Sequence, residues 1–357
     1  MSTPVTIVQI AKECGVSIAT VSRVINGTAN VSPKTKERVN EVIKKYRYTP
    51  NAFARGLINR QSMTIGIIIP DITNPYFSAM FREFETAARA ANYSVFLCNT
   101  AFFSSAEASS TPPEMEYFRM MLDKKVDGVL VVGGQVDLLH INAEYKSALQ
   151  HLASSVPTVV LGRQIPDVDC LFIERESGRG VSFAIDYLAA LGHRRIAFVG
   201  GENGVDITEA RLSAYWDALD SLRLPKDVSL VETSDYYTQD GYKAMQKLLA
   251  RRTDFTAVLA VNDSVAFGAY RALADVGLRI PEDVSVISCD QFFAADYFVP
   301  RLTSINQHTE HFGRFVINAL LGIINGVKDN VKVVTTPELV LRESCAVPRP
   351  DFQDHQA

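Results

Sequence analysis

The chain has 357 residues, enough for more than one domain, and its 47% hydrophobic and 21% charged residues are ordinary for a globular protein. Its net charge of −4 hides an uneven distribution, because residues 1–60 carry +7 and the remainder carries −11. A basic head on an acidic body favours a polyanionic partner for the head alone, although charge by itself is equally compatible with a solvated basic surface.

The cysteine pattern and the hydropathy narrow the class of protein further. Five scattered cysteines without a C-x-x-C pair indicate reduced thiols rather than a disulfide framework or a zinc site. The first residues lack a basic stretch followed by an apolar one, and no apolar run approaches the ~20 residues that span a bilayer. We therefore expect a cytoplasmic protein without a membrane segment, a bound metal or a cofactor.

Caps and periodicity predict three helices in the first fifty residues. Each helix has its own start signal, namely the capping box of Thr6 and Gln9, the cap Ser17, and the cap Ser32 followed by Pro33. Gly15 ends the first helix, and Asn26-Gly27 ends the second, "SIATVSRVING". The apolar face of the third helix is expected to consist of Val39, Val42, Ile43 and Tyr46.

The short turn at Gly15 predicts a steep crossing of the first two helices, as in a helix-turn-helix DNA reader. Packing of the apolar stripe leaves five side chains of the second helix outward: Ser17, Ile18, Ala19, Ser22 and Arg23. Arg23 suits a bidentate contact with guanine, and the expected phosphate contacts are Ser17, Ser22, Asn26 and Thr35. A plain three-helix bundle is the alternative, and the local charge of +7 favours the DNA reader.

This region resembles the lactose-repressor/galactose-repressor family of bacterial transcription regulators. The resemblance runs from Val5 to Leu57 and includes A-x-x-x-G-V-S-x-x-T-V-S-R-V-x-N. It implies DNA contacts at Thr6, Ser17, Ile18, Ala19, Ser22, Arg23, Asn26, Ser32, Thr35 and Tyr48. Ile18 and Ala19 fall where that family varies most with operator sequence, so apolar contact with thymine methyl groups is expected there.

The sequence of residues 50–62 predicts a hinge helix that is too short to be stable without a partner. "NAFARGL" is barely two turns, whereas isolated helices need ~12–15 residues, and Gly56 costs about 0.8–1 kcal/mol relative to Ala. In the resembled family two such segments pair across a dimer and wedge a leucine into the minor groove, which kinks the DNA. Leu57 matches that leucine, and Asn51 and Ala54 match its neighbours. An unremarkable linker is the alternative.

From Met63 onward, apolar runs alternate with amphipathic stretches. The runs form two series, "TIGIIIP", "SVFLCNT", "GVLVVGG", "TVVLG" and then "RIAFVGG", "AVLAVND", "VSVISCD". Such alternation indicates parallel sheets covered by helices, so the expected fold is a helical headpiece followed by two doubly wound α/β subdomains. Ligands of such sheets bind beyond the carboxyl ends of the strands, where the sequence places Asp71, Asn74, Phe77, Asn262, Asp263 and Asp290.

The acidic body resembles the effector domain of the same family, which is itself similar to periplasmic sugar-binding proteins. The matching pieces include "PDITNPYFS", "LGHRRIAFVGG" and "PRLTSINQ". The residues expected to contact an effector are Asn74, Phe77, Arg211, Tyr236, Asn262 and Asp290. Arg211 and Asp290 suit fixed hydrogen bonds to hydroxyls, and an aromatic ring suits a sugar face. Helix capping by Asn262-Asp263 and binding of loop amides by Asp290 are the alternatives.

Two stretches depart from the family pattern. "FFSSAEASSTPPEM" is longer than usual and is expected to be a surface loop. Glu174 and Arg175 stand where the family commonly has Asp-Asn, with the bulky Arg179 nearby. These differences are compatible with an effector unlike the commonest neutral sugars.

The motifs of common enzymes are missing from the sequence. There is no G-x-G-x-x-G after the first strand, no G-K-[ST], no G-x-S-x-G and no H-E-x-x-H. His308 and His311 have no obvious third metal ligand, so we expect a solvated or interface role for them, and a structural role for His193. We therefore expect no enzymatic activity.

The expected protein is a DNA-binding repressor controlled by a small carbohydrate. Its expected parts are a DNA-binding domain (1–49), a hinge (50–62), an effector-binding and dimerisation domain (63–347) and a tail (348–357). The N-subdomain is expected over 63–162 and 307–327, and the C-subdomain over 163–306 and 328–347. Operator DNA, the effector and a second copy are the expected partners. A nucleobase, a nucleoside or a phosphorylated protein is the alternative co-regulator, and the basic head disfavours a sugar-binding protein without a DNA role.

Overall fold

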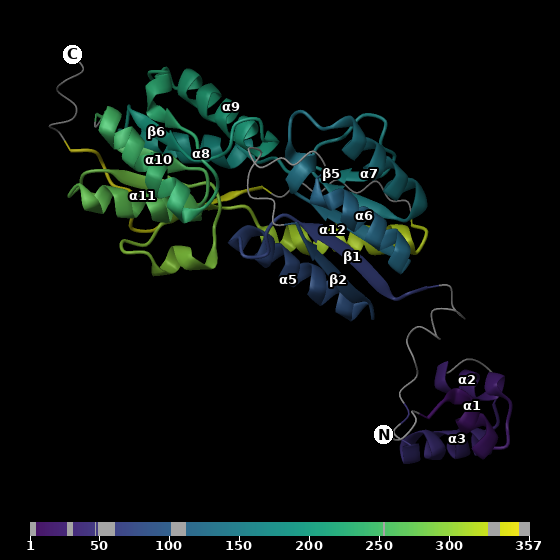
Figure 1. The fold of residues 1–357 in the computed structure, drawn as a ribbon. Helices are drawn as coiled ribbons and strands as arrows, with labels where there is room; N and C mark the ends of the chain where they lie inside the picture. Colours follow the sequence, from purple (N-terminus) through teal and green to yellow (C-terminus); the bar gives the residue numbers. More distant parts are fainter. Residues whose placement is uncertain are drawn as a thin grey trace. The chain divides into compact units, whose positions relative to one another are not determined.

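The computed structural model describes residues 5–26, 31–46, 48, 61–100, 112–252, 254–327 and 336–349. The chain divides into two compact units, Met1–Met63 and Thr64–Ala357 (Figure 1). Asn51, Ala54 and Leu57 of the expected hinge lie outside the described residues, as do most of "FFSSAEASSTPPEM" and residues 350–357.

The first unit contains three helices that begin where the sequence predicts. They are α1 (Ile7–Glu13), α2 (Ile18–Asn26) and α3 (Pro33–Tyr46). The Thr6 hydroxyl accepts from Gln9 N, and the Gln9 side chain accepts from Thr6 N, which confirms the capping box. Ser17 Oγ and Ser32 Oγ accept from the amides three residues later at 3.1 and 3.3 Å, as expected of caps.

Side chains from all three helices form a small core in the first unit. Its buried members are Ile10, Ala11, Cys14, Val21, Val24 and Val39. Gly15 takes a φ of +60° in the turn between α1 and α2, a left-handed conformation that glycine adopts without strain. The expected burial of Tyr46 is wrong, because this last residue of α3 is 40% exposed and Tyr48 packs against the core instead.

The second unit begins with a five-stranded parallel sheet in the order β2-β1-β3-β4-β5. Its strands are β1 (Thr64–Ile69), β2 (Ser94–Asn99), β3 (Gly128–Val132), β4 (Thr158–Leu161) and β5 (Leu171–Ile173). Its helices are α5 (Pro75–Ala90), α6 (Pro113–Lys124), η2 (Gly134–Asp137), α7 (Ala143–Ser155) and α12 (Thr309–Ile324). Ile67 packs with α5 and α12 on one face, whereas Ile68 packs with α6 and α7 on the other. The near-continuous apolar strands thus bury both faces.

The remaining elements form a six-stranded sheet in the order β11-β10-β9-β8-β6-β7, parallel except for β11. Its strands are β6 (Ile196–Val199), β7 (Val231–Glu232), β8 (Ala257–Ala260), β9 (Ser285–Ser288), β10 (Thr303–Asn306) and β11 (Glu338–Val340). Its helices are α8 (Gly178–Ala190), α9 (Asp206–Ser221), η3 (Val228–Leu230), α10 (Thr238–Arg251), α11 (Asp263–Asp275) and η4 (Phe293–Tyr297). These elements share one large apolar core, so the expectation of two doubly wound subdomains is confirmed.

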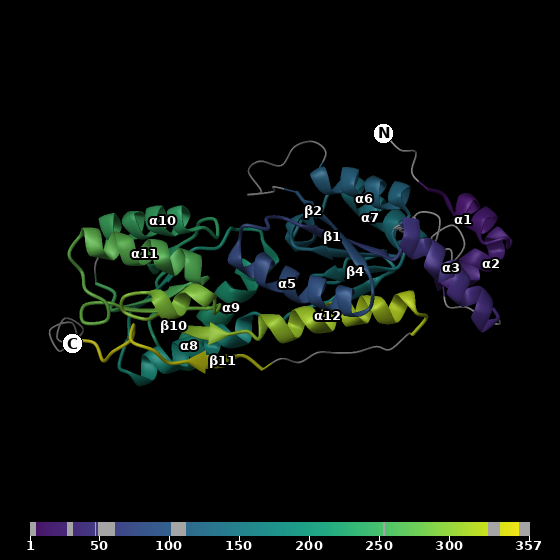
Figure 2. The same cartoon turned by 90° about the horizontal axis from the view of Figure 1, so that it is seen from below.

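The chain passes between the two subdomains after β5, after β10 and after α12. Figure 2 shows α12 beside α5 in the first subdomain, although β10 and β11, which flank α12 in sequence, lie in the second. The expected boundary at residue 162 is wrong, because β5 pairs with β4 in the first sheet. β5 is short and half-buried, so its sequence carries no strong strand signal.

None of the helices in the described ranges combines the length and the apolar character that crossing a membrane requires.

His193 ties the end of the described chain to the second subdomain. Its side chain is 1% exposed, and its Nε2 lies 2.9 Å from Ala346 O, whereas Nδ1 lies 2.8 Å from Thr256 Oγ1. The carbonyl fixes the tautomer with the proton on Nε2, so Nδ1 accepts from Thr256. Burial lowers the pKa of His193 to about 4. The expected structural role of His193 is confirmed.

Acidification from pH 7 to pH 5 is expected to lower the free energy of unfolding of the second subdomain by about 2 kcal/mol through His193. Below about pH 6.5 the unfolded chain binds a proton at this site, whereas the folded histidine stays neutral down to about pH 4. Urea unfolding followed by the fluorescence of Trp216, the single tryptophan, measures the effect. His193→Gln should remove this increment, whereas His151→Gln, at an exposed position of α7, should keep it. An unchanged pH dependence in His193→Gln would contradict the assignment.

Candidate functional site

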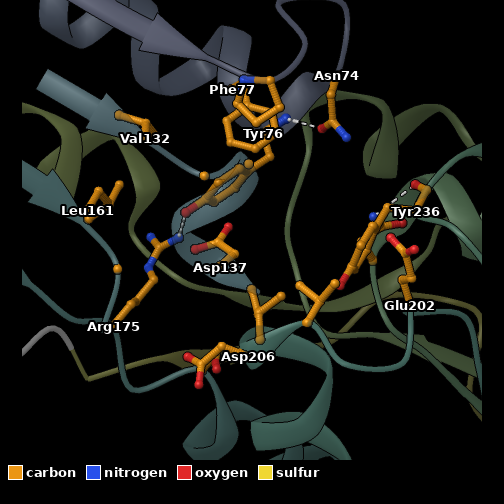
Figure 3. A pocket seen from close by; sticks show the side chains of 18 of the residues that line it. Asn74, Tyr76, Phe77, Val132, Asp137, Leu161, Arg175, Glu202, Asp206 and Tyr236 are labelled. Carbon is orange, nitrogen blue, oxygen red and sulfur yellow. Dashed lines mark hydrogen bonds between the residues drawn. The ribbon is translucent and has the colours of Figure 1, made fainter. Parts of the chain in front are cut away.

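A cavity of about 210 Å³ lies between the two subdomains. All six residues expected to contact an effector line it: Asn74, Phe77, Arg211, Tyr236, Asn262 and Asp290. Figure 3 shows Asn74 and Phe77 on the α5 side of the cavity, Asp206 on the opposite side and Tyr236 on the right flank. Residues that are far apart in the sequence therefore meet at one place, beyond the carboxyl ends of the strands.

A buried ion pair belongs to the wall that the second subdomain supplies. The guanidinium of Arg211, 2% exposed, donates to both carboxylate oxygens of Asp290 at 2.8 and 3.1 Å and also to Val261 O. Burial disfavours the charged form of Arg211, but the charge of Asp290 outweighs it and raises the pKa of Arg211. Asp290 pairs with this arginine rather than with loop amides, so the pair is a fixed, charge-neutral surface.

Two asparagines cap helices at the cavity wall. Asn262 Oδ1 accepts from Val265 N at 2.8 Å at the start of α11, and its Nδ2 donates to Tyr236 O at 3.0 Å. Asn74 Oδ1 accepts from Tyr76 N at 3.0 Å at the start of α5. The capping alternative for Asn262 is therefore correct, and it coexists with a place in the cavity. Asp263 is outside the lining and accepts from Ser288 Oγ and Phe292 N.

Several charged residues of the cavity were missed by sequence reasoning. They include Asp137, Arg163, Glu202 and Asp206, together with Glu174 and Arg175, which had been noted only as departures from a pattern. Asp137 ends η2, just after β3, and Asp206 begins α9, after β6. Their positions beyond strand ends were a usable signal.

Arg175 lies directly after β5, where the chain crosses between the subdomains. Its guanidinium lies 5.4 and 4.7 Å from the ring centres of Tyr76 and Phe312. It donates to Tyr76 Oη at 3.1 Å, to Gln307 O at 3.0 Å and to Thr309 Oγ1 at 3.2 Å. One cavity side chain thus binds the segment after β10, a second crossing of the chain.

A few hydrogen bonds join the two subdomains across the cavity. Tyr237 Oη donates to Asp71 Oδ2 at 2.9 Å, and Leu139 N donates to Gly204 O at 2.9 Å. Leu138 and Val205 form an isolated antiparallel bridge next to this contact. Among the described residues these local hydrogen bonds define one relative position of the subdomains.

No cluster of three or more His, Cys, Asp or Glu side chains suited to a metal ion occurs among the described residues. His308 Nε2 lies 3.7 Å from Glu338 Oε2, and the rings of His308 and His311 are 5.9 Å apart.

The first unit presents most of the residues expected to face DNA on its surface. Thr6, Ser17, Ile18, Ala19, Arg23 and Ser32 are exposed, whereas Ser22, Thr35 and Tyr48 are half-buried. Ile18 is 48% exposed, which is unusual for an isoleucine in a small domain. The side chain of Asn26 lies outside the described part of the chain.

Comparison with known proteins connects both units to one family. The family profile described as "Bacterial regulatory proteins, lacI family" matches residues 6–51, and that of a periplasmic binding protein-like domain matches residues 185–345. The transcriptional repressor PurR of Haemophilus influenzae (strain PittEE) is 33% identical over 346 residues, which cover 95% of this chain and 98% of that repressor.

Solved structures match the same architecture. A structure of the Lac repressor dimer bound to operator and the anti-inducer ONPF superposes with a TM-score of 0.84 at 26% identity, covering 96% of this chain and 100% of that one. A complex of the regulator CelR with cellobiose superposes with a TM-score of 0.69 at 29% identity, covering 95% and 99% of the two chains. These relatives are regulators and not enzymes. The chain belongs to the lacI family of bacterial regulatory proteins, and it is a DNA-binding transcriptional repressor with a ligand-binding domain.

Proposed function

We propose that the protein is a homodimeric repressor whose affinity for operator DNA is set by a small carbohydrate bound between the two subdomains. The observation that carries this proposal is the convergence of six residues from both subdomains on one cavity. A ligand that touches both walls shifts the equilibrium between relative positions of the subdomains, and such coupling is typically about 1–3 kcal/mol. Binding of the effector thereby changes the affinity of the protein for its operator.

The chemistry of the cavity wall supports a carbohydrate. Arg211, Asp290 and Asn262 offer donors and acceptors in fixed positions, which suit hydroxyl groups. Phe77 and Tyr236 offer aromatic rings that suit the apolar face of a sugar. The related regulator CelR was solved with cellobiose. Aromatic rings also stack on nucleobases, so a nucleoside is the second candidate effector.

In this proposal the first unit reads half of a near-palindromic operator. α2 enters the major groove, where Arg23 contacts guanine and Ile18 and Ala19 contact thymine methyl groups. Ser17 and Ser32 already cap helices through their hydroxyls, and each hydroxyl has further capacity to bind phosphate. The related Lac repressor was solved as a dimer on operator DNA. Residues 50–62 would order on that DNA, with Leu57 as a minor-groove wedge.

An exposed aromatic patch on the second subdomain supports the dimer. Phe293 is 84% exposed, Tyr297 71%, Val299 91% and Phe267 54%. Phe298, next to them in sequence, packs against Phe267 with ring centres 5.0 Å apart. Soluble monomers rarely expose such a group of large apolar side chains, so we assign this patch to contact with a second copy.

The proposed function predicts that Arg23→Ala changes specificity rather than general DNA affinity. The operator is first selected from random duplexes with the full-length protein, and binding is then compared with that of an unrelated duplex. Loss of one bidentate base contact should reduce the ratio of the two affinities by about 1–3 kcal/mol. Arg38→Ala, at an exposed position of α3, removes the same charge and should weaken both duplexes equally. Equal losses with Arg23→Ala, or no selectable operator, would refute the proposal.

A second prediction concerns the dimer. Val299→Asp places a charge in the aromatic patch and should raise the dimer dissociation constant at least about tenfold, as measured by sedimentation equilibrium. Val228→Asp is the matched control, because Val228 is also 80% exposed but belongs to η3, outside the patch. If both variants dimerise like the unchanged chain, the patch is not the interface.

A further inference from the structure

Two carboxylates of the cavity have no partner among the residues that the structure describes. Asp137 belongs to the first subdomain and Asp206 to the second, and both line the cavity. Within the part of the chain that the structure describes, neither carboxylate takes part in a hydrogen bond or an ion pair. Charged neighbours affect the pKa of each carboxylate, and Asp206 raises the pKa of Asp137. The two carboxylates therefore lie at one cavity without an ion pair, and Arg163 compensates their charges only in part.

Other charged groups around the cavity have hydrogen-bond partners for some of their donors and acceptors. Asp290 pairs with Arg211, and Glu174 Oε1 accepts from Gln164 N at 2.8 Å. Arg163 donates to the carbonyl oxygens of Leu138 and Leu139, both at 2.8 Å, rather than to a carboxylate. The guanidinium groups thus donate to neutral acceptors or, in Arg211, also to Asp290, although the buried Nε–H of each has no partner among the described residues. Asp137 and Asp206 are carboxylates with which none of these guanidinium groups pairs.

The electrostatics of the cavity disfavour a further negative charge. Burial and Asp206 raise the pKa of Asp137 to about 7, even though Arg163 opposes this shift. Burial and Glu174 likewise raise the pKa of Asp206 against the effect of Arg163. The cavity is lined by five carboxylates and three guanidinium groups, so it is negative overall when all of them are charged. An anionic ligand would add to this repulsion, and a cationic one would relieve it.

Ser177 points independently to a polar ligand in the same cavity. Its side chain is 5% exposed and lines the cavity at the start of α8. Its hydroxyl does not cap that helix and has no hydrogen-bond partner within the described residues. The hydroxyl itself keeps access to the cavity, so it is available to hydrogen-bond with a polar group of a ligand.

We propose that the effector is an amine-bearing carbohydrate whose protonated amine lies between Asp137 and Asp206. This inference rests on the proposed function, because it takes the cavity to be the effector site. A neutral hydroxyl can donate to these carboxylates but cannot neutralise them, whereas an ammonium group does both. Because the carboxylates belong to different subdomains, the amine bridges the cavity and favours the position in which its walls are close.

Matched pairs of sugars test the proposal. The full-length protein is titrated calorimetrically at pH 7 with D-glucosamine and D-glucose, D-galactosamine and D-galactose, and D-mannosamine and D-mannose, with D-glucose 6-phosphate and adenosine as further arms. In at least one pair the amine should bind at least about tenfold more tightly than its neutral partner. The phosphorylated sugar should bind more weakly than D-glucosamine.

Isosteric variants connect that preference to the two carboxylates. Asp137→Asn and Asp206→Asn should each reduce the amine preference to about threefold or less, since each removes one charged contact. Asp186→Asn is the matched control, because Asp186 is exposed on α8 and does not line the cavity. Without ligand, the first two variants should melt at or above the temperature of the unchanged chain, because they remove uncompensated charges. A clear fall in melting temperature would reveal an internal partner and contradict the proposal.

The outcomes distinguish an amine-bearing effector from a carbohydrate effector in general. A neutral or phosphorylated sugar that binds more tightly than every amino sugar overturns this inference but leaves a carbohydrate effector in place. An amine preference that survives in both Asp137→Asn and Asp206→Asn overturns it as well. Binding of adenosine without binding of any sugar overturns the carbohydrate effector and this inference together.

Discussion

The two sheets of the ligand-binding unit are separate, yet the chain passes between them after β5, after β10 and after α12. This connectivity is the constraint on which the rest of the structure depends. A single crossing would leave the subdomains free to part, whereas several crossings restrict their relative motions. The cavity lies between the carboxyl ends of the two sheets, so any occupant contacts both subdomains.

The charges of the cavity fall into two groups with different physical roles. The pair of Arg211 and Asp290 is buried, bidentate and neutral, so it fixes one wall without requiring a ligand. Asp137 and Asp206 form no such pair among the described residues, and burial is the main cause of their raised pKa values, which Arg163 opposes. Arg175 links this chemistry to the crossings, because it lines the cavity and also binds Gln307 and Thr309 after β10. A ligand that contacts Arg175 would therefore also affect the segment in which the chain crosses between the subdomains.

Local signals in the sequence predicted much of the fold. The caps at Thr6, Ser17 and Ser32 were found because capping depends on residues only three positions apart. The apolar runs identified strands such as β1 and β3, which are buried on both faces. β10 was missed because its sequence, "TSIN", is polar. Its buried groups are satisfied by partners distant in sequence, such as Ser344 Oγ, which accepts from Thr303 N at 2.8 Å.

The cavity was predictable only in part, for the same physical reason. Resemblance to a family placed Arg211, Tyr236, Asn262 and Asp290, and the structure brings them together. No local pattern relates Asp137 to Asp206, because their proximity exists only after both subdomains have folded and met. Arg175 departs from the family pattern in the sequence, but its contacts with Tyr76 and Phe312 could be identified only in the tertiary structure.

The central claim is that the relative position of the subdomains sets operator affinity, and a reversible cross-link tests it without knowledge of the effector. Leu138 and Val205 face each other in an isolated antiparallel bridge, where Cα atoms are about 4.5–5.5 Å apart, within the range of disulfides. In Leu138→Cys/Val205→Cys, oxidation should change the dissociation constant of the selected operator at least about fivefold, and reduction should restore it. The single variants should not respond. Equal operator affinity of the oxidised and reduced double variant would contradict the account.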